Sequence, residues 1–129
     1  MAKKVLIVDD EPNIVVSLEF LLRQSGYEVH IAADGEAALR QVQAVAPDLV
    51  LLDVMMPEKN GYDVCRRIRA RPEWSKIRIV FLSAKGREAE MTKGLSLGAD
   101  AYVTKPFSNA ELVARIGELL QERGAPAGA

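Results

Sequence analysis

The sequence predicts an α/β protein in which helices cover both faces of a parallel sheet. Five short runs rich in β-branched and apolar residues have the length of strands. They lack the alternation of strands with one wet face, so both of their faces are expected to be buried. Between the runs, apolar residues recur every three or four positions, which is the spacing of one helix face. A strand that is followed each time by a crossover helix gives a parallel sheet. We therefore expect a (βα)5, flavodoxin-like, doubly wound sheet with the strand order 2-1-3-4-5.

The expected strands and helices alternate along the chain. The strands are expected at residues 4–8, 28–32, 48–52, 77–82 and 101–104. The helices that follow them are predicted from apolar residues at helical spacing, which are Ile14, Leu18, Leu21 and Leu22 after the first strand, Leu39, Val42 and Val45 after the second, Val64 and Ile68 after the third, Met91 and Leu95 after the fourth, and Leu112, Ile116, Leu119 and Leu120 after the fifth. Gly26 and Gly98 stand where helices are expected to stop, and Ser108 with Glu111 forms a capping box that starts the last helix.

Length and composition indicate one globular domain. The chain has 129 residues, of which 49% are hydrophobic and 27% are charged, so it can bury a single core. We expect the domain to span residues 1–123 and residues 124–129 to form a flexible tail, because the tail has no periodicity. Seventeen basic and eighteen acidic residues leave a net charge of −1. A nucleic-acid-binding domain would have a basic excess, so no direct contact with nucleic acid is expected.

The hydrophobic runs are too short for a membrane protein. The longest of them, such as residues 5–8 and 79–82, have four residues, whereas a membrane span needs about 18 or more. The first run leads directly into Asp9, Asp10 and Glu11, which is unlike a signal peptide. A cytoplasmic protein without membrane contact is therefore predicted.

Several conspicuous residues are expected to be structural. The single cysteine and the single histidine cannot form an internal disulfide or a zinc tetrad, so Cys65 and His30 are expected to be structural residues. Trp74 is expected to anchor a loop. A basic cluster in the third helix is expected to be a solvated helix face; it consists of Arg66, Arg67, Arg69 and Arg71.

Acidic side chains gather where the predicted strands end. Asp9 and Asp10 follow the first strand, and Asp53 follows the third. These strands are neighbours in the expected order and their carboxyl ends share one edge, so the carboxylates are expected to lie roughly 5 Å apart. At an effective dielectric constant of about 20, each pair would repel by about 3 kcal/mol. A cation is therefore expected among them, and Mg²⁺ suits carboxylate ligands combined with a phosphate oxygen.

A hydroxyl and an amine complete this edge of the sheet. Ser83 follows the fourth strand, next to Asp53, so its short side chain is sufficient to reach the site. Lys105 follows the fifth strand, about 10 Å away, so only a long side chain can return to the acids. The residue types therefore match the distances that the fold imposes.

Four stretches of the sequence are similar to those of a known family. They are V-L-I-V-D-D-E-P at 5–12, P-D-L-V-L-L-D-V-M-M-P at 47–57 with Gly61 following, F-L-S-A-K at 81–85, and G-L-S-L-G-A-D-A-Y-V-T-K-P-F at 94–107. Over residues 3–122 the chain resembles the receiver domain of two-component response regulators, whose chemotaxis member has the strand order 2-1-3-4-5.

The resemblance implies a phosphorylation site that contains a metal ion. Asp53 is expected to be the phosphoacceptor. Asp10, Asp53 and the backbone carbonyl of Met55 are expected to bind Mg²⁺ directly. Asp9 is expected to hold the ion through water.

The resemblance also implies a phosphate contact and a conformational switch. Lys105 is expected to contact the phosphoryl oxygens and to precede a cis bond to Pro106. Ser83 and Tyr102 are expected to form the switch pair. Their movement would re-shape the face made by the fourth helix, the fifth strand and the fifth helix.

The partners that the resemblance implies are proteins. A sensor histidine kinase or a histidine phosphotransfer protein would dock on the first helix and the neighbouring loops, and an unknown downstream protein would bind the switched face. Dimerising relatives carry a second acid before the switch tyrosine, where this chain has Ala101, so Arg115 lacks one expected partner. An exposed ion pair is worth only about 0–1 kcal/mol. We therefore expect a monomer, with a dimer of the phosphorylated form as the alternative.

The residues leave other functions open. One alternative is that the chain is the front half of a DNA-binding response regulator. Another is a degenerate receiver that binds partners without being phosphorylated. A Mg²⁺-dependent phosphatase that forms an aspartyl phosphate would carry Asp-x-Asp after the first strand, where this chain has Asp9-Asp10. A flavodoxin would need a phosphate loop rich in Ser, Thr and Gly there, and residues 11–13 do not supply it. A phosphoacceptor signalling domain that is not an enzyme is the favoured interpretation.

Overall fold

A five-stranded parallel sheet forms the centre of the computed structural model, which describes residues 3–54, 61–83 and 88–124. The elements in chain order are β1 (Lys4–Val8), α1 (Pro12–Gln24), β2 (Glu28–Ala32), α2 (Gly35–Val45), β3 (Leu49–Asp53), α3 (Gly61–Arg69), the 3-10 helix η1 (Pro72–Trp74), β4 (Arg78–Ser83), α4 (Glu88–Ser96), β5 (Ala101–Thr104) and α5 (Asn109–Gly124). The strand order is β2-β1-β3-β4-β5, and all four strand pairs are parallel. The predicted fold class and strand order are confirmed.

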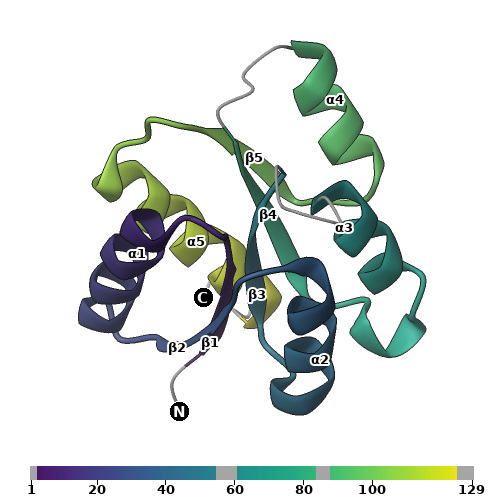
Figure 1. The fold of residues 1–129 in the computed structure, drawn as a ribbon, viewed down its shortest axis with the longest axis horizontal. Helices are drawn as coiled ribbons and strands as arrows, with labels where there is room; N and C mark the ends of the chain where they lie inside the picture. The colour runs from purple at the N-terminus through teal and green to yellow at the C-terminus, as the bar shows by residue number, and fades with distance from the viewer. Residues whose placement is uncertain (1–2, 55–60, 84–87, 125–129) are drawn as a thin grey trace.

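Helices lie on both faces of the sheet (Figure 1). On one face, Leu18 of α1 and Ile116 of α5 belong to the same buried cluster as sheet residues such as Leu51. On the other face, Val42 of α2 and Ile68 of α3 pack in a second cluster with other sheet residues. Every residue of β3, the central strand, is buried. Burial from both sides explains why the strand sequences are continuously apolar.

The third and fourth strands begin and end one residue later than predicted. Asp48 precedes β3, and its carboxylate accepts a hydrogen bond from the backbone N–H of Lys4, at 2.8 Å. At the other end, Asp53 is paired in register with Leu82, and Ser83 is paired with Thr104. Asp53 and Ser83 are therefore the last residues of their strands and not the first residues of loops. The ladder fixes their backbones.

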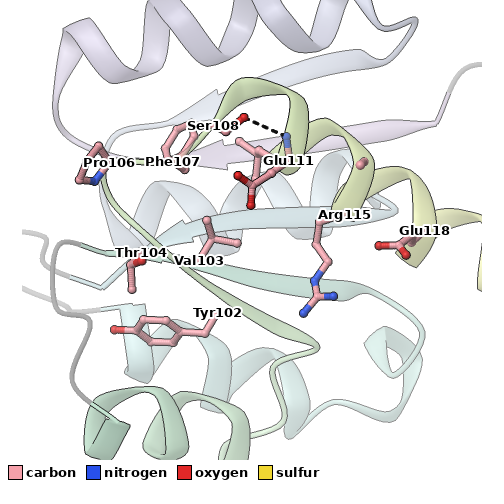
Figure 2. Close-up of a pocket in the computed structure, with 11 residues that line it drawn as sticks. Tyr102, Val103, Thr104, Pro106, Phe107, Ser108, Glu111, Arg115 and Glu118 are labelled. Carbon is pink, nitrogen blue, oxygen red and sulfur yellow. Dashed lines mark hydrogen bonds between the residues drawn. The ribbon is translucent and has the colours of Figure 1, made fainter.

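The helix-end signals in the sequence have the expected geometry. Gly26 and Gly98 have positive φ angles of 95° and 106° just beyond α1 and α4, a conformation that most side chains disfavour. The Ser108 hydroxyl accepts a hydrogen bond from the backbone N–H of Glu111 at 3.3 Å, so the predicted cap of α5 is confirmed (Figure 2).

The last helix continues slightly further than the domain boundary predicted for it. α5 includes Gly124, the first residue of the expected tail. Residues 125–129 lie outside the described ranges. None of the helices in the described part of the chain is long and apolar enough to cross a lipid bilayer.

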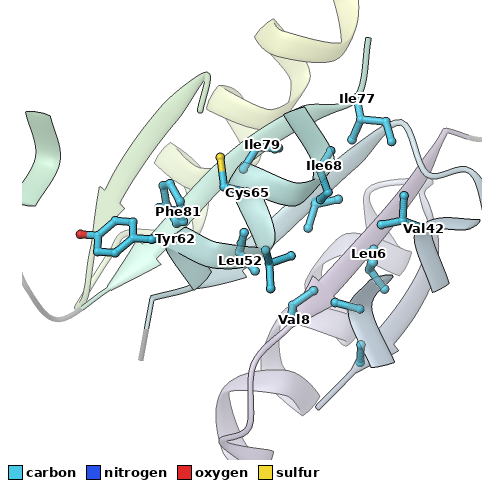
Figure 3. Close-up of a cluster of buried hydrophobic side chains, with 14 of the residues drawn as sticks. Leu6, Val8, Val42, Leu52, Tyr62, Cys65, Ile68, Ile77, Ile79 and Phe81 are labelled. Carbon is cyan, nitrogen blue, oxygen red and sulfur yellow. The ribbon is translucent and has the colours of Figure 1, made fainter. Parts of the chain in front are cut away.

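The residues expected to be structural make structural contacts. Cys65 on α3 is fully buried in the cluster that Figure 3 shows, and its Sγ lies 3.6 Å from the carbonyl oxygen of Leu97. His30 pairs with Glu28 on the same strand, with 2.6 Å between Nε2 and Oε2. Trp74 packs against the core from η1. These three expectations are confirmed.

The burial of Cys65 predicts low thiol reactivity. Burial raises the pKa of the Cys65 thiol to about 11, from an ordinary value of 9.0. The folded state therefore retains the thiol proton more tightly than the unfolded state. We expect this contribution to stability to be constant below pH 9 and to decline as the pH rises towards 11. In the folded chain, alkylation by iodoacetamide at pH 8 should be slower than in urea by at least about 100-fold. Equal rates in the two conditions would contradict the buried, protonated thiol.

Candidate functional site

Three carboxylates meet at the carboxyl edge of the sheet. Oxygen atoms of Asp9, Asp10 and Asp53 all lie within 4.8 Å of one another. Asp9 and Asp53 are buried, with 2% and 7% of their surface exposed, whereas Asp10 is exposed. The predicted acidic cluster is confirmed, and it opens to solvent on the side of Asp10.

Local hydrogen bonds hold Asp9 in place. Its Oδ1 accepts a hydrogen bond from the backbone N–H of Glu11 at 2.9 Å. Its own backbone N–H donates to the carbonyl oxygen of Ala32, at 3.2 Å, and so ties the end of β1 to the end of β2. The direction of the Asp9 carboxylate is thus set before any ligand enters the site.

Lys105 extends from the end of β5 back to the acids. Its Nζ lies 3.2 Å from Oδ2 of Asp9 and 3.7 Å from Oδ1 of Asp53. The backbone N–H of Lys105 donates to the carbonyl oxygen of Ser83 at 2.7 Å, and the peptide bond to Pro106 is cis. The long reach across β4 that the strand spacing required is therefore present, and so is the expected cis bond.

The two residues expected to form a switch lie on adjacent strands. Ser83 ends β4 and is fully buried. Tyr102 on β5 is 8% exposed and packs against Phe81, with ring centroids 5.9 Å apart. The tyrosine ring therefore lies inward, on the side of the sheet that α4 flanks. A Cβ added to Gly94 of α4 would lie 2.9 Å from Cδ2 of Tyr102, so α4 contacts the ring closely because this position has no side chain.

The donor set fits a divalent cation. Three carboxylates and one ammonium group leave two net negative charges at the site, which one divalent cation would neutralise. Carboxylate oxygens are hard ligands of the kind that Mg²⁺ prefers. Met55, whose backbone carbonyl is an expected ligand, lies outside the described residues.

The crowding of the acids gives a prediction for the metal-free protein. Asp10→Asn removes one of the three charges, and Asp10 is not within ion-pair distance of Lys105. Because Asp10 is exposed, we expect a gain in the free energy of unfolding of about 1 kcal/mol without Mg²⁺. Chelator-treated protein should therefore unfold at higher urea concentration, while addition of Mg²⁺ should stabilise the variant less than the wild type. Lower stability of metal-free Asp10→Asn would contradict the repulsion between the carboxylates.

One arginine of the basic cluster was assigned wrongly from the sequence. Arg66 and Arg71 are more than half exposed, as expected for a solvated face. The Arg69 side chain is only 20% exposed, and it donates to the carboxylate of Asp100 at 3.0 Å and to the carbonyl oxygen of Gly98 at 2.8 Å. Arg78 also pairs with Asp100, at 3.1 Å. Asp100 therefore ties α3, β4 and the start of β5 together.

A groove of about 450 Å³ runs between β5 and α5 (Figure 2). Tyr102 and Arg115 both line it. Arg115 is exposed on α5. Ala101 is buried at the start of β5.

Comparison with known proteins supports the resemblance to receiver domains that the sequence motifs indicate. A family model described as the response regulator receiver domain matches residues 5–117. A candidate response regulator from Chloroflexus aurantiacus is 39% identical, with a TM-score of 0.89 over 93% of this chain and 98% of that one. The chemotaxis response regulator CheY4 of Vibrio cholerae is 29% identical, with a TM-score of 0.87 over 92% of this chain and 99% of that one.

An activated relative has the same fold. The BeF3-activated N-terminal receiver domain of RstA from Klebsiella pneumoniae is 29% identical, with a TM-score of 0.86 over 92% of this chain and 99% of that one. The family match, the strand order and the acidic cluster agree with one another. This chain belongs to the response regulator receiver domains of two-component signalling.

Proposed function

We propose that Asp53 accepts a phosphoryl group from a histidine kinase or a histidine phosphotransfer protein. The observation that carries the proposal is the convergence at Asp53, which ends the central strand. Its carboxylate lies with those of Asp9 and Asp10 within 4.8 Å, and the Lys105 ammonium is 3.7 Å away. Asp9 has the same kinds of neighbour, but Asp53 is the member of the cluster that ends the central strand, next to the strand that ends at Ser83.

The chemistry requires a nucleophile and neutralisation of phosphoryl charge. An oxygen of ionised Asp53 attacks the phosphorus atom in line with the bond to the donor imidazole. A P–O bond forms, the P–N bond breaks, and the imidazole nitrogen leaves with the electron pair and takes up a proton. Lys105 and the hydroxyl of Ser83 would stabilise charge on the equatorial oxygens. No general base is needed, because the nucleophile is already ionised.

The proposed metal ligands are those of the acidic cluster. Asp10, Asp53 and the backbone carbonyl of Met55 would hold Mg²⁺ directly, and Asp9 would hold it through water. The proximity of the three carboxylates supports the acidic members of this set. When bound, the ion supplies positive charge to the phosphoryl oxygens. Lys105, whose Nζ lies 3.7 Å from Oδ1 of Asp53, would hold a second phosphoryl oxygen.

The proposed output is a change at the face made by α4, β5 and α5. Ser83 and Tyr102 would couple the phosphoryl group to this face, with Ser83 drawn towards the new oxygens. The position of Tyr102, inward and against Phe81, supports a role in which its ring occupies the space behind Ser83. We propose that the domain acts as a monomer that presents this face to a downstream protein. It would be a signalling domain and not a turnover enzyme.

Phosphoryl transfer to the intact chain tests the proposal. The protein is incubated with acetyl phosphate and Mg²⁺ and then reduced with borohydride, which converts a phosphorylated aspartate into homoserine. The product is digested and analysed by mass spectrometry. The expected result is homoserine at position 53. Its formation should require Mg²⁺, and treatment with hydroxylamine before the reduction should prevent it. Repeated hydrolysis of a small phosphoester, with many molecules turned over for each protein molecule, would instead indicate a phosphatase.

Two exposed apolar side chains on α1 support a docking surface for the phosphoryl donor. Val16 and Phe20 are 65% and 64% exposed and lie four residues apart, on the helix that begins beside Asp9 and Asp10. Such residues occupy one face of a helix, and exposed apolar pairs of this kind often anchor a protein partner. The donor would therefore dock on α1 with its histidine directed at the acidic cluster.

This surface gives a prediction that separates docking from chemistry. Phe20→Ala should raise the half-saturating concentration of the cognate kinase or phosphotransfer protein by about tenfold, because aromatic anchors carry much of the energy of an interface. Labelling by acetyl phosphate should not change. Leu95→Ala, at a position 45% exposed on α4, serves as the matched control. Equal effects of the two substitutions on transfer would argue against α1 as the docking surface.

A further inference from the structure

A second groove lies between α2 and α3, away from the acidic cluster. It has a volume of about 520 Å³, and none of the acidic-cluster residues lines it. The two helices pack side by side on the sheet face opposite α1 and α5 (Figure 1). α3 starts at the carboxyl edge of the sheet with Gly61, so Arg71 and Trp74, which follow the end of α3, lie towards the opposite edge.

The rim of this groove is positively charged. Arg40 on α2 and Arg67 on α3 line it from opposite sides, and both are exposed. Across the part of the chain that the structure describes, neither guanidinium has a carboxylate within 4.0 Å. Other arginines of the described chain are paired with carboxylates, namely Arg23, Arg66, Arg69, Arg71 and Arg78. Of these, Arg71, which pairs with Glu73, also lines the groove. Glu36 is the acidic residue among those lining the groove, and it has an interaction of its own. Two cations that have no carboxylate partner among the described residues thus face the same groove.

The floor of the groove is apolar. Leu39, Ala70 and Trp74 line it, and Leu39 and Trp74 also pack against the core beneath. The guanidinium of Arg71 lies 4.8 Å from the centroid of the Trp74 ring, which brings a third cation to the same site. Arginine and tryptophan are the residues most enriched among the energetically dominant positions of protein interfaces. A ligand with both negative charge and an apolar side chain would match the rim and the floor together.

We propose that the groove between α2 and α3 binds an acidic peptide segment of a partner protein, with its carboxylates on Arg40 and Arg67 and an apolar side chain on the floor. A nucleic acid fits the observations less well. Sequence-independent binding of single strands uses open aromatic faces on which bases stack. Trp74 is half-buried, and Arg71 covers its ring. The proposal concerns a surface separate from Asp53 and does not depend on phosphorylation.

Trp74 supplies a direct probe of the groove, because it is the single tryptophan of the chain. The full chain is titrated with a synthetic peptide, acetyl-Glu-Glu-Leu-Glu-Glu-amide, while the emission of Trp74 is recorded. A saturable change is expected. The affinity for the peptide should fall as NaCl is raised from about 0.1 M to about 1 M, because the added salt shortens the screening length from about 10 Å to about 3 Å. The same peptide with Gln in place of every Glu should give no saturable change.

Charge reversal locates the binding site. Arg40→Glu and Arg67→Glu should each weaken peptide binding by about tenfold or more. Arg66→Glu is the matched control, since Arg66 is exposed on the same helix, is paired with Asp63 and does not line the groove. Its peptide affinity should stay within about twofold of the wild type. Asp53→Asn should bind the peptide like the wild type, so failure of the phosphoacceptor assignment would leave this result unaffected.

Three outcomes would overturn the proposal. The first is the absence of a saturable change in Trp74 emission with the acidic peptide. The second is an equal loss of affinity in Arg66→Glu and Arg67→Glu, because the effect would then arise from overall charge. The third is tighter binding of a dodecamer of thymidylate than of the peptide, with loss in the same two groove variants, which would assign the groove to nucleic acid.

Discussion

Asp53→Asn is expected to abolish labelling by acetyl phosphate in the presence of Mg²⁺. The substitution keeps the size of the side chain at the end of β3, so the fold and the neighbouring strands should be preserved. It replaces an ionised oxygen nucleophile with a neutral amide, and we expect a loss of at least about 1,000-fold in the rate of labelling. The measurement is the amount of acid-stable, hydroxylamine-sensitive phosphate on the protein after a fixed time.

Two further variants make this result specific. Asp63→Asn removes a carboxylate that is exposed on α3 and paired with Arg66, so labelling should remain at the level of the wild type. Asp10→Asn removes an expected metal ligand but keeps the nucleophile, so labelling should be slowed and partly restored by more Mg²⁺. Label retained at full level in Asp53→Asn, or mapped to Asp9 or Asp10 in the wild type, would refute the assignment of Asp53.

The parts of the structure that the sequence predicted well depend on simple repetition. A strand buried on both faces is apolar throughout, so the alternation of strands and helices could be identified along the whole chain. The acidic cluster was predictable for a related reason. Parallel strands end at one edge, and Asp9 and Asp53 therefore had to meet once β1 and β3 were recognised as neighbours. The reach of Lys105 followed from the spacing of the strands.

Other features were not predictable, because they depend on contacts between residues far apart in the sequence. Arg69 was grouped with exposed arginines, yet it binds Asp100, which is 31 positions away. No spacing rule for helices or strands connects such a pair. The hydrogen bond from the backbone of Lys4 to the side chain of Asp48, 44 positions later, is another contact of this kind. The groove between α2 and α3 likewise combines residues whose proximity depends on helix packing.

Gly61 was part of the family resemblance seen in the sequence, but the physical reason for a glycine at this position is visible only in the structure. It is the first residue of α3, and its backbone N–H donates to the carbonyl oxygen of Val54 at 2.9 Å. A Cβ at this position would overlap the backbone carbonyl oxygen of Asp53 and lie 3.1 Å from Cα of Val54. The contacting atoms belong to the backbone, so they cannot rotate away as a flexible side chain would.

Gly61→Ala is therefore expected to be strongly destabilising and to disturb the phosphoacceptor. To accommodate the methyl group, α3 must move away from β3 or the end of β3 must shift, and we expect the free energy of unfolding in urea to fall by about 3 kcal/mol. Labelling at Asp53 should be slower even at temperatures where the variant is fully folded, because the carbonyl that the methyl group displaces belongs to Asp53 itself. Circular dichroism during urea titration and the acetyl phosphate assay measure the two effects.

Gly117→Ala is the matched control for this variant. Gly117 lies within α5, and the nearest atom to an added Cβ would be the hydroxyl oxygen of Tyr27, at an ordinary contact distance of 3.9 Å. Alanine is the better helix former, so this variant should gain about 0.5–1 kcal/mol and label like the wild type. The opposite signs of the two glycine substitutions would show that close approach to β3, and not helix propensity, determines the residue at position 61. If Gly61→Ala instead gained stability as Gly117→Ala does, the tight contact between the start of α3 and the backbone of Asp53 would be wrong.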